Sequence, residues 1–405
     1  MTKSKKELKT EKMLKTKAET KERRSSLDCK TYSVKIDSSH FNRLTQEYFK
    51  KVFLEAKWFY NYVLTQDFKT FDTKIKEVKI LNKEKVEEIR EIKHLSSQMK
   101  QSIFQRAIDN CVGLKASKSK GRRIGKLKFK TIVNSIPLVQ TNVTFRIVSA
   151  NHIELQKLKQ KLRVRGLKQI KNFEEIACAT LIRSCGSYYL NVIGYEKPKS
   201  RVLLGDIGID MGIKTDLTFS NRIKLDCKIP VSNSTKRVQR RIAKSVKGSK
   251  NRWKLRNNLQ KEYAKSSNQR KDIKNKVVSY LKNNFEIFIQ DEMIKQWQSG
   301  RFGKAISKSA IGEIKSSLKN NEHTHVVPRS YPSTKLCYKC GTLNTISLSE
   351  RVYRCDCGYT QDRDIHSAIN IILAERKEFK PLENDITSSM LKYFKTIPNI
   401  EVNIV

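Results

Sequence analysis

The stretch LGDIGIDMGIKTDLTFS, residues 204–220, decides the fold class that we expect for the second half of the chain. Its apolar positions predict a strand, a turn and a second strand. Asp210 follows the first apolar strand and lies between two glycines, which let a backbone or a substrate approach closely. A carboxylate at a strand end can face a cleft, but an aspartate near glycine is more often an ordinary turn residue. Asp210 therefore becomes a candidate site only together with other acids.

A second acid follows another apolar strand. Residues 285–290 predict a short buried strand, and Asp291 and Glu292 come directly after it. Neighbouring side chains on a strand point to opposite sides, so only one of these two acids can share a cleft with Asp210.

Asp362 and Asp364 form the third acidic segment, at the start of a predicted helix over residues 364–376. One of them can serve instead as the helix N-cap. Three acids from three segments stand out in a chain with 40 acidic and 84 basic side chains. Carboxylates beside phosphate would repel it unless divalent metal lies between them. Two Mg²⁺ ions held by carboxylates can activate a water and stabilise the leaving 3′-oxygen of a phosphodiester.

The composition indicates a polyanionic partner. The chain has 405 residues and a formal net charge of +44 at pH 7, which favours nucleic acid and argues against an enzyme of sugar or lipid metabolism. No stretch approaches the length of about 18 apolar residues that a membrane span needs. The N-terminus lacks the apolar region of a secretory signal. We therefore expect a cytoplasmic protein, nucleoid-associated if bacterial, with no membrane partner.

Four of the nine cysteines form two close pairs, Cys337 with Cys340 and Cys355 with Cys357. A glycine follows each pair and gives the chain room to fold back, so that backbone amides can face the thiolates. Four thiolates fill the tetrahedral coordination of Zn²⁺, which predicts one structural zinc in a ribbon. The alternatives are an iron–sulfur cluster, which the spacing favours less, and four unrelated buried cysteines. The scattered remaining cysteines suit a reducing compartment.

The first half of the chain predicts a basic arm, a helical region and a β-rich region. Residues 1–26 favour a solvated or disordered arm over a specific RNA-binding arm. Helical periodicity covers residues from about 39 to 63, with Ser38 or Ser39 as N-cap, and from about 83 to 112. Period-two alternation predicts strands at 30–36, 136–140, 143–147, 152–155, 177–183 and 188–195.

Two basic segments are candidate nucleic-acid contacts. Residues 115–130 carry eight Lys or Arg and no acid, and residues 231–280 carry sixteen basic and two acidic side chains in a helical pattern. Such segments can neutralise phosphates, although a solvated charged surface has the same composition. The side chains that we single out are Lys118, Lys120, Arg122, Arg123, Lys126, Arg237, Arg240, Arg241, Lys244 and Arg252.

The motifs occur in the order of a known family. They are Gly208-Ile-Asp-Met-Gly212, the strand ending in Glu292, Pro332 to Gly341, Cys355-Asp-Cys-Gly358 and Asp362 to Ile371. This order resembles the TnpB transposon-encoded nucleases and their relatives, the compact type V CRISPR nucleases. The resemblance is specific over about residues 202–376 and looser over 30–200. It implies a multidomain α+β protein, in which an RNase H-like (RuvC) α/β nuclease domain with a zinc ribbon joins a β-barrel-like wedge and a helical recognition module.

The resemblance also implies where the domains lie. We expect a flexible basic arm at 1–27, the wedge at 28–38 and 125–200, the recognition module at 39–124, the RuvC-like domain at 201–330 and 360–376, the zinc ribbon at 331–359 and a C-terminal tail at 377–405.

The family's catalytic acids carry onto Asp210, Glu292 and Asp364, which would hold Mg²⁺, as two ions. Many relatives have Glu-Asp-Leu where this chain has Gln290-Asp291-Glu292. If Gln290 takes the usual glutamate position, Glu292 is two residues further and on the same strand face, so we choose Glu292 over Asp291. The helix after Asp364 has His-Ser-Ala where Asn-Ala-Ala is common.

The function that we expect is cleavage of target DNA by a metal-dependent endonuclease with a guide RNA, associated with a transposon or a CRISPR system. Base pairing would supply sequence specificity, and the protein would act as a monomer or as a homodimer on one RNA. The alternative is a non-cleaving nucleic-acid-binding regulator or transposition accessory protein. Some family members have lost the acidic triad and act as RNA-guided repressors, whereas the presence of three acids here favours a nuclease.

Overall fold

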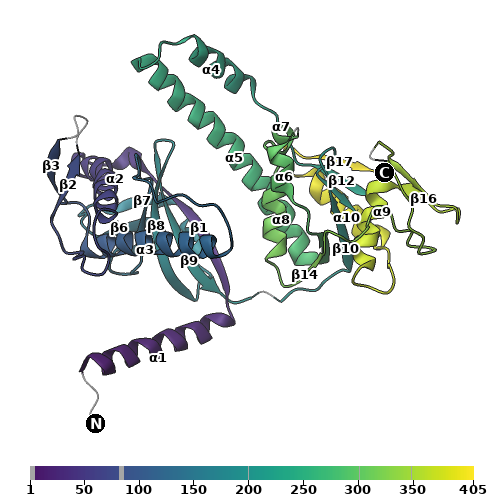
Figure 1. Cartoon of the computed structure of the whole chain (residues 1–405), viewed down its shortest axis with the longest axis horizontal. Helices are drawn as coiled ribbons and strands as arrows, with labels where there is room; N and C mark the ends of the chain where they lie inside the picture. The colour runs from purple at the N-terminus through teal and green to yellow at the C-terminus, as the bar shows by residue number, and fades with distance from the viewer. Residues whose placement is uncertain (1–4, 82–85, 199, 301, 348) are drawn as a thin grey trace. The chain divides into compact units, whose positions relative to one another are not determined.

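The computed structural model describes residues 5–81, 86–198, 200–300, 302–347 and 349–405 (Figure 1). The chain forms two compact units, unit 1 over Met1–Lys199 and unit 2 over Ser200–Val405. Within the described ranges, no helix is both long and apolar enough to cross a membrane.

Unit 1 is built on one antiparallel sheet. Its strands are β1 (Asp28–Ile36), β4 (Ser135–Leu138), β5 (Phe145–Ser149), β6 (His152–Leu155), β7 (Leu162–Arg165), β8 (Glu175–Ser184) and β9 (Ser187–Glu196). They pair in the order β4-β8-β9-β1-β7-β6-β5. Thr141, just after β4, bridges Phe145 at the start of β5, so the sheet is a nearly closed barrel. This confirms the predicted β-rich region, to which the early strand over 30–36 belongs.

Unit 1 also contains helices and a hairpin. They are α1 (Lys5–Ser25), η1 (Ser38–His40), α2 (Arg43–Val63), the hairpin β2 (Glu77–Leu81) and β3 (Glu87–Glu91), α3 (Ser97–Ser119) and η2 (Leu167–Ile170). The apolar face of α2 packs on the sheet, with the Phe49 ring 4.4 Å from the Tyr188 ring of β9. Residues 5–25 of the predicted arm are helical, and Arg24 at the end of α1 pairs with Glu175 at 2.5 Å.

Two helices of unit 1 begin later in the sequence than predicted. The helix predicted from about 83 begins only at Ser97, where the Ser96 hydroxyl accepts from the Met99 amide; residues 83–85 lie outside the described residues. Residues 87–91 instead pair with β2, because cross-strand pairing outweighs their helical periodicity. The helix predicted from about 39 begins at Arg43, because Asn42, rather than Ser38 or Ser39, caps it.

Unit 2 contains a mixed six-stranded sheet. Its strands are β10 (Asp206–Met211), β11 (Leu217–Phe219), β12 (Ile223–Asp226), β13 (Glu286–Gln290), β14 (Thr324–Val327) and β17 (Glu401–Ile404). They pair in the order β14-β13-β10-β11-β12-β17. Strands β10, β13 and β14 are parallel, whereas β10 to β12 form an antiparallel meander. The tail after residue 377, for which the sequence predicted no structure, supplies β17 and a helix.

Helices follow the strands of unit 2. They are α4 (Asn233–Lys244), α5 (Lys250–Asn284), α6 (Ile294–Ser299), α7 (Gly303–Ile306), α8 (Ile311–Lys319), α9 (Arg363–Leu373) and α10 (Asn384–Lys395), and the ribbon hairpin is β15 (Val352–Arg354) with β16 (Thr360–Asp362). Helices α7 and α8 are separated by a short irregular segment. The Lys308 carbonyl accepts there from the Ile229 amide, and the Ser309 hydroxyl accepts from the Ile311 amide.

Helix α9 lies directly on strand β10. A Cβ added to Gly208 would lie 2.0 Å from the carbonyl oxygen of Ala368, so only glycine permits this approach. The close packing brings the first turns of α9 to the carboxyl end of β10, where Asp210 lies.

Candidate active site and metal centre

The first candidate acid lies at the carboxyl end of two neighbouring parallel strands. Ile209 on β10 is in register with Ile289 on β13, so Asp210 and Gln290 occupy adjacent strand ends. Ligand sites in open α/β sheets form at the carboxyl ends of the strands. The sheet therefore places Asp210 where a cleft is expected.

Two other carboxylates act on Asp210 at this edge. The pKa of Asp210 is raised to about 7, first by burial and then by the negative charges of Asp364 and Glu292. The hydroxyl of Ser367 donates to Asp210 Oδ1 at 2.8 Å and opposes this rise. The structure thus brings the three predicted acids into electrostatic contact, while their catalytic role stays a prediction.

The structure decides which acid caps α9. Asp362 Oδ1 accepts from the backbone amides of Asp364 and Ile365 at 3.0 and 3.2 Å, so Asp362 is the N-cap. Lys224 on β12 pairs with Asp362 at 2.8 Å and lies 3.9 Å from Asp364. Asp364 is therefore the acid of this segment that can belong to the site.

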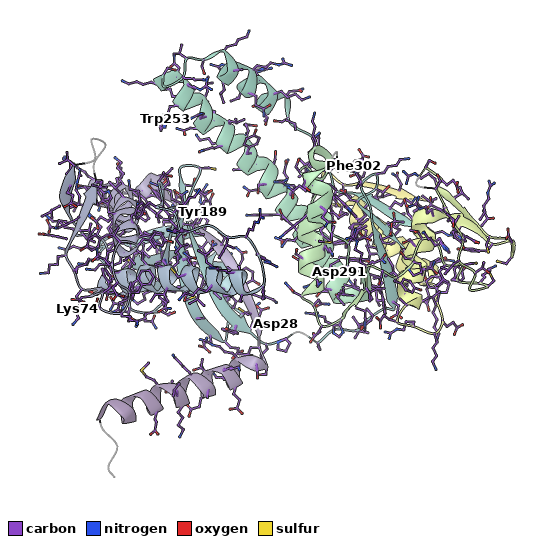
Figure 2. All side chains as sticks on the ribbon, viewed as in Figure 1. Asp28, Lys74, Tyr189, Trp253, Asp291 and Phe302 are labelled. Atoms are coloured by element: carbon purple, nitrogen blue, oxygen red, sulfur yellow. The ribbon has the colours of Figure 1, made fainter. Side chains whose placement is uncertain are left out.

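Asp291 and Glu292 differ in their surroundings, as expected for adjacent residues. Asp291, labelled in Figure 2, binds the ammonium groups of Lys315 and Lys319 on α8 at 2.8 and 3.2 Å. The hydrogen bond from Lys315 is the main reason why the pKa of Asp291 is lowered. Glu292, in contrast, contributes to the raised pKa of Asp210. This difference supports the choice of Glu292.

Four side chains form a chain of hydrogen bonds that the sequence did not predict. We call Asp210, Ser367, Ser333 and Gln290 the Asp210 relay. The Ser367 and Ser333 hydroxyl oxygens are 3.0 Å apart, and Ser333 donates to Gln290 Oε1 at 2.8 Å. Gln290 Nε2 then donates to the carbonyl of Tyr331 at 2.7 Å. The only hint in the sequence was His-Ser-Ala in place of Asn-Ala-Ala.

The number of hydroxyl protons limits the hydrogen bonds that the relay can contain. Three oxygen–oxygen contacts join its four members, but the two serines carry only two hydroxyl protons. Ser367 donates to Asp210 and Ser333 donates to Gln290, so the contact between the two serines is a close approach of their hydroxyl oxygens.

The donor set suits a hard divalent cation. Carboxylate oxygens are the ligands that Mg²⁺ prefers, and a cation would relieve the repulsion that raises the pKa of Asp210. Asp210, Glu292 and Asp364 are the residues that would hold it. They are spread more widely than the cysteines, because only the cysteine group, among the described His, Cys, Asp and Glu residues, has its ligand atoms within 4.8 Å of one another.

The four predicted cysteines come together as one cluster. The sulfur atoms of Cys337 and Cys357 are 3.7 Å apart, and those of Cys340 and Cys355 are 3.5 Å apart. Tetrahedral Zn²⁺ with Zn–S bonds of about 2.3 Å requires sulfur separations of this size. Hydrogen bonds, first from the Thr342 hydroxyl, lower the pKa of Cys340 and so favour its thiolate. The cluster therefore fits the predicted structural zinc.

The ribbon is fastened to α9. His366 on α9 stacks on Tyr353 of β15, with ring centres 3.7 Å apart. Asn370 Nδ2 donates to the carbonyls of Ser333 and Leu336, both at 2.7 Å. The helix that carries Asp364 is thereby held by the zinc ribbon and by the loop that enters it.

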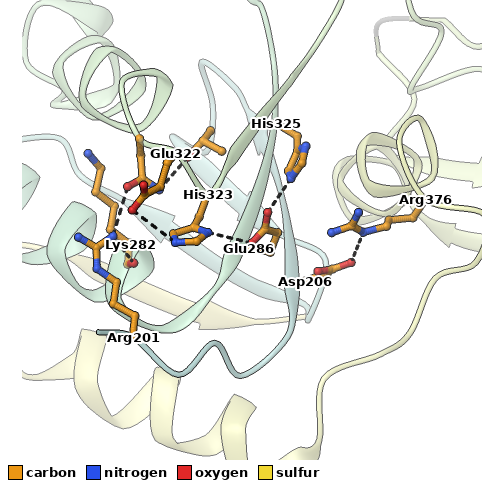
Figure 3. Close-up of polar contacts among 10 residues, drawn as sticks. Arg201, Asp206, Lys282, Glu286, Glu322, His323, His325 and Arg376 are labelled. Carbon is orange, nitrogen blue, oxygen red and sulfur yellow. Dashed lines mark hydrogen bonds and ion pairs between the residues drawn. The ribbon is translucent and has the colours of Figure 1, made fainter. Parts of the chain in front are cut away.

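A second polar cluster lies at the opposite, amino ends of the parallel strands (Figure 3). Glu286 on β13 contacts His325 at 2.7 Å and His323 at 3.3 Å. Asp206 on β10 pairs with Arg376 at 2.9 Å. These contacts connect the amino ends of β10, β13 and β14 with the residues around them.

The predicted basic residues lie on exposed surfaces, with one exception. Lys118, Lys120, Arg122, Arg123 and Lys126 are exposed at and after the end of α3, and Arg237, Arg240, Arg241 and Lys244 are exposed on α4. The Arg252 guanidinium instead donates to the carbonyls of Ile242 and Ser245 at 2.9 and 2.7 Å. Arg252 therefore closes the turn between α4 and α5. Trp253 lies in the first turn of α5 (Figure 2).

Two segments match known families. Residues 197–288 match the OrfB family of the IS605 elements, described as "Probable transposase". Residues 314–371 match the family described as "Cas12f1-like, TNB domain". The first match contains Asp210, and the second contains the four cysteines and Asp364.

Individual proteins are similar over about half of this chain. "Putative RNA-guided DNA endonuclease" of Streptomyces pristinaespiralis is 28% identical over 235 residues, 55% of this chain and 58% of the relative. "Putative RNA-guided DNA endonuclease InsQ" of Escherichia coli (strain K12) is 24% identical over 244 residues, 53% of this chain and 60% of the relative. "Putative transposase A625R" of Paramecium bursaria Chlorella virus 1 is 25% identical over 205 residues, 46% of this chain and 47% of the relative.

This chain thus spans less than two thirds of the length of each of these relatives. The family matches cover Asp210, Asp364 and the cysteine cluster, whereas Glu292 lies between the two matched segments. Two segments of this chain thus resemble the IS605 OrfB (TnpB) family and the Cas12f1-like TNB domain.

Proposed function

We propose that this protein is an RNA-guided DNA endonuclease that hydrolyses phosphodiester bonds at Asp210, Glu292 and Asp364. The observation that carries the proposal is the electrostatic contact of these three carboxylates at the carboxyl ends of parallel strands. In a chain of net charge +44, acidic side chains gathered at one place with a perturbed pKa indicate a functional site.

The topology of unit 2 supports an RNase H-like (RuvC) domain. Counted in chain order from β10, the first five strands lie in the order third, second, first, fourth, fifth. The first three are antiparallel neighbours, and the last two run parallel to the first. This order is typical of RNase H-like sheets, and α9 brings the third acid to the first strand.

The acids have distinct roles in the proposed reaction. Bound Mg²⁺, as two ions, would lower the pKa of the attacking water and stabilise the leaving 3′-oxygen. Asp210, held from Ser367 at 2.8 Å, would fix the position of the cation site, and Asp364 and Glu292 would complete its ligands. Lys224, 3.9 Å from Asp364, would be placed to meet a phosphate oxygen.

The proposed partners are a guide RNA and a target DNA. Two relatives carry the name RNA-guided DNA endonuclease. The exposed basic residues of α3 and α4 are suited to phosphates, whereas base pairing with the guide would read sequence. One or two protein copies on one RNA would suit this arrangement.

One observation favours a second candidate, a non-cleaving RNA-guided DNA-binding regulator. The group that ends β13 beside Asp210 is the neutral amide of Gln290, which is engaged by Ser333 and by main-chain carbonyls. An acid enters the site from this strand only through Glu292, beyond the strand end. If Glu292 fails as a ligand, the protein would bind target DNA without cutting it.

Asp210→Ala separates the two candidates. The variant and the wild type would be purified with their co-expressed RNA and tested for target binding and for Mg²⁺-dependent cleavage. We expect Asp210→Ala to lose cleavage and to retain RNA and DNA binding. A wild type that binds its target with high affinity but leaves it intact would establish the regulator instead. The exposed Asp272 on α5 provides the control Asp272→Ala.

A further inference from the structure

The other three members of the Asp210 relay are buried more deeply than Asp210 itself. Ser367, Ser333 and Gln290 are 0%, 4% and 7% exposed, whereas Asp210 is partly accessible. Burying hydroxyl and amide groups costs free energy unless each finds a partner. Here Ser367 donates to Asp210, Ser333 donates to Gln290, and Gln290 donates to the main chain. Such an arrangement holds its members in one geometry.

Two buried amides fix the loop between β14 and the ribbon. Gln290 Nε2 donates to the carbonyls of Pro328, Arg329 and Tyr331 at 3.2, 3.3 and 2.7 Å. Asn370 binds the same loop from α9, at the carbonyl of Ser333. The Ser333 hydroxyl is therefore presented to Ser367 by a loop that is anchored from both the sheet and α9.

Ser367 is fixed from the other side. The carbonyl of Ala368, the next residue, would be 2.0 Å from a Cβ on Gly208, so the absence of a side chain there lets α9 lie this close to β10. The Ser367 hydroxyl then lies 2.8 Å from Asp210 Oδ1 and 3.0 Å from Ser333. The position of the Ser367 hydroxyl between Asp210 and Ser333 therefore depends on the contact of α9 with β10.

We propose that Ser367, Ser333 and Gln290 are positioning residues that together hold the Asp210 carboxylate for a divalent cation. The inference rests on the proposed function, because that function assigns a cation to Asp210. The relay engages Oδ1 of Asp210, one of the carboxylates that would hold the cation. Groups that orient a metal ligand in this way typically contribute about 10- to 100-fold to metal affinity or activity.

Gln290 suits this role because it is an amide. Its Nε2 faces three carbonyl oxygens and can donate to them, while its Oε1 accepts from Ser333. A carboxylate at this position would place negative charge against the same three carbonyls. The amide in this chain is therefore a structural partner of the loop rather than a metal ligand.

The test measures Mn²⁺ affinity of the RNA-free full-length protein by calorimetry or electron paramagnetic resonance. Asp210→Ala defines which binding event belongs to the site. We expect Ser367→Ala and Ser333→Ala to weaken that event about 10-fold or more. Ser367→Thr keeps the hydroxyl and should retain most of the affinity. Ser316→Ala, at an exposed position on α8, is the matched control and should not change it.

A double-mutant cycle tests whether the residues act in series. Ser367→Ala already disconnects Asp210, so adding Gln290→Ala should weaken Mn²⁺ binding little further. Additive losses would mean that the two residues act independently and would overturn the relay. If Gln290→Ala unfolds the loop, Ser333→Ala replaces it in the cycle, with the same expectation.

Gln290→Glu discriminates between a positioning residue and an empty ligand position. We expect weaker Mn²⁺ binding and a lower melting temperature, because a carboxylate would face three carbonyls. Tighter Mn²⁺ binding with an unchanged fold would overturn the assignment of Gln290.

The outcome for the relay is separable from that for the proposed function. A wild type that cuts no DNA, with Mn²⁺ binding that depends on Ser367, would refute the nuclease and support the relay. Active cleavage with Mn²⁺ affinity and turnover unchanged in Ser367→Ala would refute the relay and leave the nuclease intact. Wild-type Mn²⁺ binding that is indifferent to Asp210→Ala would overturn the cation role of the relay.

Discussion

Replacing Asp210 by Asn should stabilise the metal-free protein, and it should do so only where Asp210 would otherwise be ionised. The structure raises the pKa of Asp210 from 3.8 to about 7, through burial and the charges of Asp364 and Glu292. Asn keeps an oxygen that can accept from Ser367, so the relay remains connected. The substitution therefore removes the charge and leaves the local hydrogen bonds in place.

The sign and size of the effect follow from proton binding. Between about pH 4 and pH 7 the folded protein binds the proton that the unfolded chain has lost, so the free energy of unfolding falls as pH rises. Above about pH 7 both states are ionised and the loss is complete. A shift of this size corresponds to about 4 kcal/mol at 1.36 kcal/mol per pKa unit, which is an upper limit because water screens a partly accessible carboxylate.

The assay is urea unfolding followed by tryptophan fluorescence. Trp297 on α6 belongs to the same unit as Asp210, and replacing Trp58 and Trp253 by Phe leaves it as the sole reporter. We expect Asp210→Asn and its parent to unfold alike at pH 4. At pH 8 the variant should be more stable, by up to about 4 kcal/mol. Millimolar Mg²⁺ should narrow the gap, because it stabilises only the parent.

Asp272→Asn is the control, because the exposed Asp272 makes only a surface ion pair with Lys276. Its effect should be within about 0.5 kcal/mol at both pH values. Asp210→Asn that is no more stable than its parent at pH 8, or a gap that does not grow from pH 4 to pH 8, would refute the electrostatic description of the site.

Three further predictions concern the ribbon, the second acid and the contact of α9 with β10. Chelating zinc, or Cys340→Ser, should remove about one equivalent of bound zinc, loosen α9 through the ribbon and abolish cleavage. Full activity of a protein that elemental analysis shows to be free of zinc would contradict this. Glu292→Gln should lower the cleavage rate at least about 100-fold while Asp291→Asn, on the lysine-bound side, retains most of it, and equal losses in the two variants would exclude Glu292 as the second ligand. Gly208→Ala should destabilise unit 2 by more than about 3 kcal/mol in urea unfolding, because its Cβ would meet the Ala368 carbonyl at 2.0 Å, and near-wild-type stability would show that α9 can move away.

The features that sequence predicted best are those encoded in short segments. The cysteine cluster follows from the spacing of two close pairs, and the structure brings their sulfur atoms within 4.8 Å of one another. Asp210 follows an apolar run whose strand was confirmed, because buried parallel strands need such runs. The position of Asp210 at a strand end was therefore predictable, whereas its catalytic role stays a prediction.

The features that sequence missed depend on register and on contacts between distant segments. Ser333 and Ser367 are 34 residues apart, and no local pattern relates them to each other or to Asp210. The choice between Asp362 and Asp364 as N-cap also needed geometry, because both precede the same helix. The helix predicted from about residue 83 failed since a strand partner, β2, competes for residues 87–91.

The central claim is that a guide RNA directs this protein to cut DNA at the carboxylate site. The most direct measurement is to isolate the protein with its co-purifying RNA, replace the guide segment of that RNA by a new sequence, and assay Mg²⁺-dependent cleavage of plasmids matching either sequence. We predict that cleavage moves to the plasmid matching the new guide and disappears with EDTA or with Asp210→Ala. Heterogeneous RNA that salt removes, with no cleavage that follows the guide, would contradict the claim.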